Sequence, residues 1–139
     1  MKGCYRMFDD INFNLIPKTL NALSLRHTVI SQNISNYNTP GYKRKYVDFE
    51  SELQKCISEN NVLNLKTNNT KHINNTSSLE IIQATIKEDD SKSLRDDDNN
   101  VDPDKEFVSM IENTFKYNTL SRMMTYAIQR YDTAIRGGK

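Results

Sequence analysis

Large side chains recur at alternating steps of four and three residues near the start of the chain. The positions are Ile16, Leu20, Leu23, His27, Ile30, Ile34 and Tyr37. Such spacing is typical of a heptad seam along one face of an α-helix, here with one polar member, His27. The pattern predicts a helix of about 33 Å from residue 16 to residue 37, with Pro17 in its first turn. Thr39, Pro40 and Gly41 predict where it ends, because proline disfavours the α conformation of the preceding residue and glycine accepts a positive φ.

The last part of the chain carries a longer seam with the same alternation of steps. Its members are Phe107, Met110, Thr114, Tyr117, Ser121, Met124, Ile128, Tyr131 and Ile135. A second apolar stripe, formed by Val108, Ile111 and Phe115, lies beside this seam near its start. The apolar face is therefore wider than one partner helix covers, and further protein surface is needed to shield it.

Capping residues mark both ends of this second helix. Asp102 is a favourable N-cap and Pro103 suits the first helical position. Gly137 and Gly138 predict the end after Arg136, whose positive charge suits a helix C-terminus. Residues 104–136 should therefore form a helix of about 50 Å.

Residues 43–101, between the two helices, are rich in asparagine and show no sustained period. Phe49, Leu53 and Ile57 are spaced by four and predict a short helix from residue 48 to residue 57. Residues 79–86 have strand-like content. We therefore expect a mainly α fold in which the N-terminal segment (1–42) and the C-terminal segment (102–139) pair through their helices as a coiled coil, with an irregular middle segment (43–101) that has room for short β-strands.

The two seams define the residues expected to pack helices together, within the subunit or between subunits. They are Leu20, Leu23, Ile30, Ile34, Phe107, Met110, Tyr117, Met124, Ile128, Tyr131 and Ile135. All of these except Phe107, Met110, Tyr117 and Ile135 are expected in the core of the paired helices. The 22-residue and 33-residue helices differ in length, so part of the longer one is left for neighbouring copies to cover.

Composition and charge narrow the classes of function. The chain has 139 residues, of which 36% are hydrophobic, and a net charge of +1. A balanced charge provides no global field that would attract nucleic acid or a membrane. No stretch approaches the ~20 apolar residues that span a bilayer. The first residues lead into Asp9 and Asp10 without an apolar core, so we expect no cleavable secretory signal.

Candidate chemistry is sparse, and we expect no enzyme, cofactor, metal or small-molecule substrate. Cys4 and Cys56 lack metal-ligand spacing, although a disulfide between them stays open. His27 and His72 are the only histidines. A small enzyme using Cys56 or His72 lacks an evident third group that would orient a nucleophile and its base. Lys43, Arg44 and Lys45 are too few cations for nucleic-acid binding, and acidic residues 88–104 lack the sequence of a calcium loop.

The end of the first helix carries a specific motif. Residues 33–43 read Asn-Ile-Ser-Asn-Tyr-Asn-Thr-Pro-Gly-Tyr-Lys. This segment resembles the N-terminal signature of the flagellar rod and hook protein family, in which Asn-Ile-(Ala/Ser)-Asn leads into Thr-Pro-Gly-Tyr. The matching positions are Asn33, Ile34, Asn36, Thr39, Pro40, Gly41 and Tyr42.

A second resemblance lies around the start of the last helix. Val101, Asp102, Glu112 and Asn113 match an Asn-x-Val-Asp…Glu-Asn-(Ser/Thr)-x-x-Tyr segment of the proximal rod proteins. Residues 70–73 (Thr-Lys-His-Ile) and 48–53 resemble the B-type branch of this family. Residues 97–99 read Asp-Asp-Asn where the family often has Asp-Gly-Asn. We therefore expect either Asp98 or Asn99 to adopt the left-handed conformation.

The resemblance implies a structural function. It implies that the two ends of the chain form a helical coiled-coil domain. It also implies that copies fold as they assemble and stack into the rod, which crosses the periplasm and transmits torque. The implied partners are other copies, other rod subunits, the membrane ring with its adaptor protein, and the flagellar type III export apparatus. The alternative that the seams leave open is a soluble helical adaptor or export chaperone, which would form a compact dimer or heterodimer.

Overall fold

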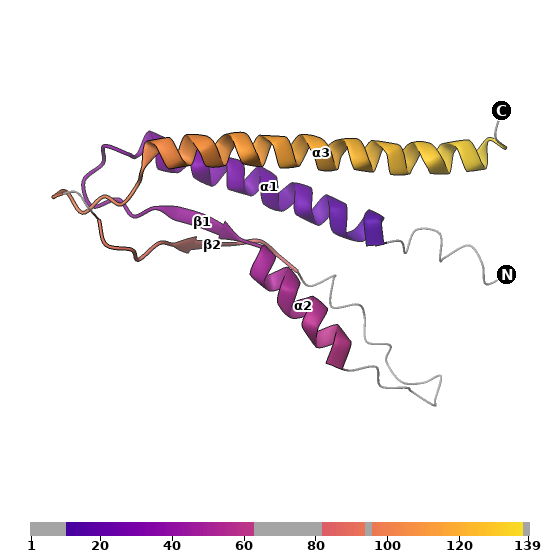
Figure 1. Ribbon diagram of the computed structural model, residues 1–139, viewed down its shortest axis with the longest axis horizontal. Helices are drawn as coiled ribbons and strands as arrows, with labels where there is room; N and C mark the ends of the chain where they lie inside the picture. Colours follow the sequence, from indigo (N-terminus) through magenta and orange to yellow (C-terminus); the bar gives the residue numbers. More distant parts are fainter. Residues whose placement is uncertain (1–10, 63–81, 94–95, 138–139) are drawn as a thin grey trace.

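The computed structural model describes residues 11–62, 82–93 and 96–137. Three helices account for most of this part: α1 (Ile11–Ser35), α2 (Glu50–Val62) and α3 (Pro103–Ile135). Two short strands, β1 (Lys45–Asp48) and β2 (Thr85–Glu88), lie between them. The helices α1 and α3 run antiparallel, side by side, along the long axis of the molecule (Figure 1). The expected mainly α fold with paired terminal helices is therefore confirmed.

The helix α1 begins earlier than the sequence pattern predicted. It starts at Ile11, so Pro17 lies inside the helix rather than in its first turn. Proline removes one backbone hydrogen bond and normally disfavours a helix interior. Ile16 is buried immediately before it, and this packing offsets the lost hydrogen bond. The predicted end is confirmed: α1 stops at Ser35, and Gly41 has a φ of 71°.

Local chemistry fixes the bounds of α3 as expected. The Asp102 side chain accepts hydrogen bonds from the backbone N–H groups of Asp104, at 3.1 Å, and Lys105, at 3.3 Å. Pro103 is the first helical residue, and the helix ends at Ile135 with Gly137 following at a φ of 74°. Asp98, rather than Asn99, has the left-handed backbone, with a φ of 58°.

The middle of the chain packs against the outer face of α1. Strands β1 and β2 pair antiparallel, with Lys45 opposite Glu88 and Asp48 opposite Thr85. Ala22 of α1, Phe49 and Ile82 form a small buried cluster, and Leu53 of α2 packs against it. The predicted short helix is thus confirmed, although it runs from residue 50 to residue 62. The motif at residues 70–73 and the first part of the predicted strand, residues 79–81, lie outside the described residues.

The helix α1 lies at the centre of the subunit, because it packs against β1 as well as against α3. Leu23 and Ile30 are buried, as are Ala22 and Val29. Strand β1 and α3 both contact α1. In the described ranges, no helix combines the length and apolar character needed to cross a bilayer.

Candidate functional site

A buried polar junction joins the end of α1 to the start of α3. The Asn33 amide nitrogen donates to the Glu106 carboxylate at 3.0 Å and to the Lys45 carbonyl at 2.7 Å. The Asn33 amide oxygen accepts from the Lys45 N–H at 3.0 Å and from the Tyr42 hydroxyl at 3.3 Å. All four hydrogen-bonding positions of this fully buried amide are therefore used. The junction fixes how α1, β1 and α3 meet.

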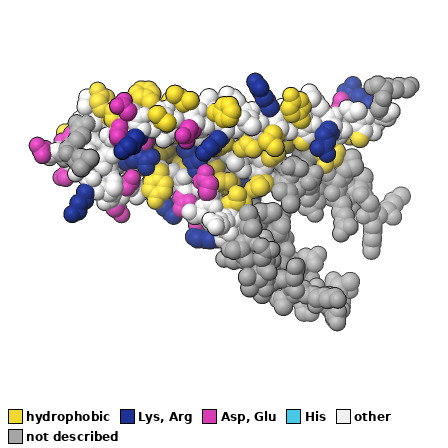
Figure 2. Space-filling model, viewed as in Figure 1, with side chains coloured by type: hydrophobic (Ala, Val, Ile, Leu, Met, Phe, Trp, Pro, Cys, Tyr) yellow, Lys and Arg dark blue, Asp and Glu magenta, His cyan; other side chains and the backbone are white. Residues whose placement is uncertain are grey.

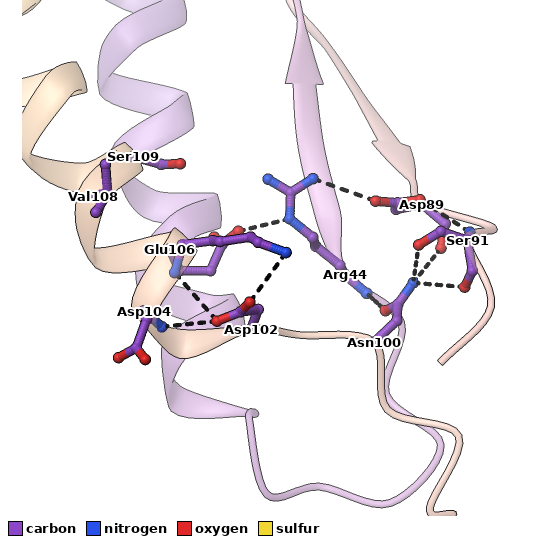
Figure 3. Close-up of a pocket in the computed structure, with 10 residues that line it drawn as sticks. Arg44, Asp89, Ser91, Asn100, Asp102, Asp104, Glu106, Val108 and Ser109 are labelled. Atoms are coloured by element: carbon purple, nitrogen blue, oxygen red, sulfur yellow. Dashed lines mark hydrogen bonds and ion pairs between the residues drawn. The ribbon is translucent and has the colours of Figure 1, made fainter. Parts of the chain in front are cut away.

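Arg44 neutralises the buried carboxylate from the other side. Its Nε lies 2.6 Å from Glu106 Oε1, and its guanidinium also pairs with Asp89 at 3.5 Å. Asn100 accepts from the Arg44 backbone N–H at 2.7 Å and donates to the Asp89 carbonyl at 2.7 Å. Figure 3 shows Arg44 between Glu106 on one side and Asp89 on the other. A buried charge is tolerated only when it is paired in this way.

A cleft of about 630 Å³ opens over this junction (Figure 3). Its walls include Asp89, Asn100, Asp102 and Glu106. Each of these side chains already bonds to a neighbouring part of the chain. Among the described residues, no three acidic, histidine or cysteine side chains are grouped to hold a metal ion. The polar groups of the cleft thus serve to hold the loop and the α3 start in place.

Asn99 holds the turn that follows α1. Its amide nitrogen, almost fully buried, donates to the carbonyl groups of Asn36 at 2.9 Å, Tyr37 at 3.1 Å and Thr39 at 2.9 Å. These carbonyl groups belong to the turn after Ser35, the last residue of α1, so the Asn99 side chain holds this turn from a distant part of the chain. The Gly41 N–H donates to the Asp97 carbonyl at 2.8 Å in the same contact.

Several carboxyl groups around this end of the molecule are stabilised in their charged form. Hydrogen bonds from the Lys105 backbone and side chain lower the pKa of Asp102. Hydrogen bonds from Ser91 lower the pKa of Asp89, with a smaller contribution from Arg44. On the sheet, the hydrogen bond from Lys87 lowers the pKa of Asp48. These groups are half-buried and each is paired with a neighbouring side chain, so their shifts describe local pairing rather than a reactive site.

The structure distributes the predicted packing positions over three environments. Leu23 and Ile30 are buried. Leu20, Ile34, Met110, Met124 and Tyr131 are half-buried, and Phe107, Tyr117, Ile128 and Ile135 are exposed. Glu106 and Asn113, each one position before a residue of the seam, face α1, and this rotation of α3 turns Phe107 outward. The last turns of α3 extend beyond the start of α1 at Ile11 (Figure 1).

Asn113 sets this rotation further along the helix. Its amide nitrogen donates to the Leu23 carbonyl of α1 at 2.9 Å, and the side chain is buried. Together with the bond between Asn33 and Glu106, this contact fixes which face of α3 meets α1. His27, the polar member of the first seam, is exposed beside Asn113 and Tyr117 at the edge of the helix pair.

The opposite side of α3 carries an exposed apolar stripe, formed by Phe107, Val108, Ile111 and Phe115. Ile111 is 71% exposed and Phe115 is 73% exposed. With roughly 100° between successive residues, these positions fall on the side of α3 away from Glu106 and Asn113. Figure 2 shows hydrophobic side chains along the outer edge of α3. We call this surface the outer stripe.

Several of the residues that matched the family signature lie at the junction or in the turn beside it. Asn33 and Tyr42 take part in the hydrogen bonds of the junction. In the turn, the Gly41 N–H donates to the Asp97 carbonyl, and Thr39 donates to the Asn36 side chain at 3.2 Å. Val101 and Asn113 are buried and Asp102 caps α3, whereas Pro40 and Glu112 are exposed and Ile34 is half-buried.

Sequence reasoning did not identify Glu106, Arg44 and Asn100 as a connected cluster. Glu106 is an acidic residue in the first turn of α3, and a helix start alone accounts for such a charge without burial. The one available signal was the position of Glu106 seven residues before Asn113, which places two polar side chains on the same face of a long helix.

Comparisons with known proteins agree with this arrangement. A family model described as flagella basal body rod protein matches residues 18–43, which cover most of α1 and the turn after it. The flagellar basal body rod protein FlgB of Borreliella burgdorferi is 33% identical over 111 residues, covering 77% of this chain and 82% of the relative. The Borrelia hermsii protein of the same name is 30% identical over 131 residues, covering 91% and 97%. That of Bacillus subtilis is 31% identical, covering 86% and 91%.

Proposed function

The chain belongs to the family of flagellar basal body rod proteins FlgB, which are structural subunits, and on that premise we propose that it builds the proximal rod by helix packing. In this proposal the subunit carries out no catalysis. Its work is mechanical, because torque passes through many helix contacts shared between neighbouring subunits.

The outer stripe is the observation that supports this proposal. Phe107, Val108, Ile111 and Phe115 are more than half exposed on the rigid helix α3. Each such side chain gains about 1.5–3 kcal/mol when it is fully buried. A continuous apolar stripe on a monomer therefore marks a surface that another protein covers. In a tube of identical subunits, that cover is a helix of the neighbouring copy.

The polar junction gives this stripe a fixed position. Asn33, Arg44 and Glu106 lock the start of α3 against α1 and β1. Because the buried polar groups bond to specific partners, α3 has one rotation about its axis and presents one face outward. Subunits that share this rotation present identical surfaces, which a regular assembly requires.

Family membership supports further proposals about where the chain works. We propose that its partners are other copies, other rod subunits, the membrane ring with its adaptor protein, and the type III export apparatus. The corresponding location is the basal body rod in the periplasm. The relatives do not favour the alternative of a soluble helical adaptor or export chaperone.

The experiment introduces a charge into the outer stripe. Ile111→Lys and Phe115→Lys are made singly and together in the full chain, and Gln54→Lys, on the exposed surface of α2, is the matched control. We expect unchanged helical circular dichroism for all variants. The stripe variants should be absent from isolated basal bodies and should not support swimming. The control variant should be present in basal bodies and should support swimming.

The Ile111→Lys/Phe115→Lys double variant tests directly whether the outer stripe mediates assembly. Normal amounts of the Ile111→Lys/Phe115→Lys protein in basal bodies, with normal swimming, would show that the outer stripe does not mediate assembly. Loss of both functions together with loss of helical structure would show instead that the stripe contributes to folding. The single variants then separate these effects, because each introduces only one charge.

A further inference from the structure

A small pocket opens at the edge of the helix pair, away from the polar junction. Its volume is about 230 Å³, and a cavity of about 150 Å³ already accommodates benzene. Six residues of α1 and α3 line it: Leu23, Ser24, His27, Asn113, Thr114 and Tyr117. Leu23 and Asn113 are buried, whereas the other four residues are exposed. The buried pair therefore lies deepest, and the exposed residues form the rim.

Asn113 brings an unpartnered oxygen to this pocket. The residue is 3% exposed, and no described residue donates a hydrogen bond to its Oδ1. The amide cannot satisfy this oxygen by exchanging its two ends, because Nδ2 already donates to the Leu23 carbonyl at 2.9 Å. A buried acceptor without a donor is unfavourable, and most such groups in folded proteins are paired. The pocket therefore favours an occupant that donates a hydrogen bond.

The walls of the pocket limit the chemistry of that occupant. None of the six lining residues is an acid, a lysine or an arginine. A charged group would therefore lose hydration without finding a counter-charge. Leu23 and the Tyr117 ring instead offer apolar surface, and aromatic rings pack favourably in offset or edge-to-face arrangements. An aromatic ring that carries one neutral donor meets both requirements.

We propose that this pocket binds a phenol group, with the hydroxyl donating to Asn113 Oδ1 and the ring lying against Leu23 and Tyr117. A phenol hydroxyl is uncharged near neutral pH and donates one hydrogen bond. The site is complete within one subunit, so this inference goes beyond the proposed rod function and does not rest on it.

Phenol chemistry has two sources. One is a free small phenol. The other is the side chain of Tyr126 in a second copy, which is 64% exposed on α3. Tyr126 follows Phe115 by eleven residues, which is about three helical turns, so it continues the outer stripe along the same side of α3. The experiment first tests the site itself and then separates these two sources.

Two probe molecules test the site in the full chain. p-Cresol carries the tyrosine ring with its hydroxyl, and 4-fluorotoluene has nearly the same shape without a donor. Their dissociation constants are measured by NMR titration, following the backbone amides of Ser24 and Thr114. p-Cresol should bind about tenfold more tightly, because it alone pairs with Asn113 Oδ1. Absence of p-cresol binding, or equal affinity for the two probes, would overturn the inference.

Substitutions in the pocket locate the binding. Ser24→Phe places a ring at the rim and should weaken p-cresol binding by about tenfold or more. Ser51→Phe, at an exposed serine of α2, is the matched control and should bind p-cresol as the unmodified chain does. Asn113→Ala removes the acceptor and should abolish the preference for p-cresol over 4-fluorotoluene.

Circular dichroism shows whether Asn113→Ala keeps its helices. A retained preference for p-cresol in the folded Asn113→Ala variant would contradict the assigned hydrogen bond. Because Asn113 also holds α1 against α3, Ser24→Phe decides the question if the helical signal of Asn113→Ala is reduced. Unchanged p-cresol binding by Ser24→Phe would then place the ligand outside this pocket.

Tyr126→Phe identifies the source of the phenol, since it removes only the hydroxyl. Tyr46→Phe, at an exposed tyrosine of β1, is the matched control. If a second copy supplies the phenol, Tyr126→Phe should lower the amount of the chain in isolated basal bodies, whereas Tyr46→Phe should not. If a free phenol is the source, both variants should enter basal bodies normally. Either result supports the pocket as proposed. Failure of p-cresol to bind overturns it and leaves the outer stripe as the assembly surface.

Discussion

The Asn33 amide donates a 3.0 Å hydrogen bond to the Glu106 carboxylate across 73 residues of sequence, and both side chains are fully buried. This single contact joins the end of α1 to the start of α3. Asn33 also bonds both backbone groups of Lys45, so strand β1 is held by the same side chain. One amide group therefore joins α1, β1 and α3.

Removal of this amide should destabilise the subunit substantially. Asn33→Ala removes one of the hydrogen bonds to the buried Glu106 carboxylate and the side-chain partner of both Lys45 backbone groups. Each unsatisfied buried group costs about 1–3 kcal/mol. We expect the free energy of unfolding, measured by urea denaturation, to fall by about 3 kcal/mol. Asn38→Ala, at an exposed position in the same turn, should change it by less than ~0.5 kcal/mol. Equal effects of the two substitutions would contradict the role assigned to Asn33.

The ion pair between Arg44 and Glu106 should show strong coupling. Arg44→Met leaves a buried carboxylate without its cation and should cost about 3 kcal/mol or more. Glu106→Gln removes the charge but keeps a polar side chain beside Asn33. In the Glu106→Gln background, Arg44→Met should lower the free energy of unfolding much less. A double-mutant cycle by urea denaturation measures this difference, and additive effects would show that the two side chains act independently.

Stability should decrease at acidic pH. Hydrogen bonds lower the pKa of Asp102, Asp48 and Asp89 in the folded chain below the ordinary value of 3.8. The unfolded chain therefore takes up protons first as the pH falls. These carboxylates contribute stability above about pH 4, and that contribution is lost as the pH falls through their folded pKa values. Thermal denaturation between pH 7 and pH 2 measures this loss.

Asp102→Asn provides a specific check of the same effect. Asparagine is also a good N-cap, so the end of α3 keeps its hydrogen bonds at neutral pH. It does not titrate, so the pH dependence of stability should be shallower between pH 4 and pH 2. A pH profile identical to that of the unmodified chain would show that the Asp102 carboxylate contributes nothing through its shifted pKa.

Two positions with positive φ should respond in opposite ways to substitution. Gly41 has a φ of 71° with open space around its Cα, so Gly41→Ala introduces strain and no clash. We expect Gly41→Ala to lower the free energy of unfolding by about 1 kcal/mol. Asp98 has a φ of 58°, and Asp98→Gly relieves strain while the backbone contact from Lys43 to the Asp98 carbonyl is kept. That variant should be as stable as the unmodified chain or slightly more stable, by thermal denaturation.

Local sequence chemistry determined the ends of the two long helices. Asp102 and Pro103 start α3 because a carboxylate caps free N–H groups and proline needs no donor in the first turn. Pro40 and Gly41 follow the end of α1 for equally local reasons. Only the start of α1 was misplaced, because the burial of Ile16 carries the helix through Pro17.

Tertiary structure decided the rotation at which α3 meets α1. The long seam was expected on the inner face, and Met110, Met124 and Tyr131 are half-buried, whereas the neighbouring stripe at Val108, Ile111 and Phe115 is exposed. Glu106 and Asn113 fix the rotation, because burying them required the partners Asn33, Arg44 and the Leu23 carbonyl, which come from distant parts of the chain. Period and caps are properties of neighbouring residues, whereas the rotation of a helix depends on which polar groups find partners across the fold.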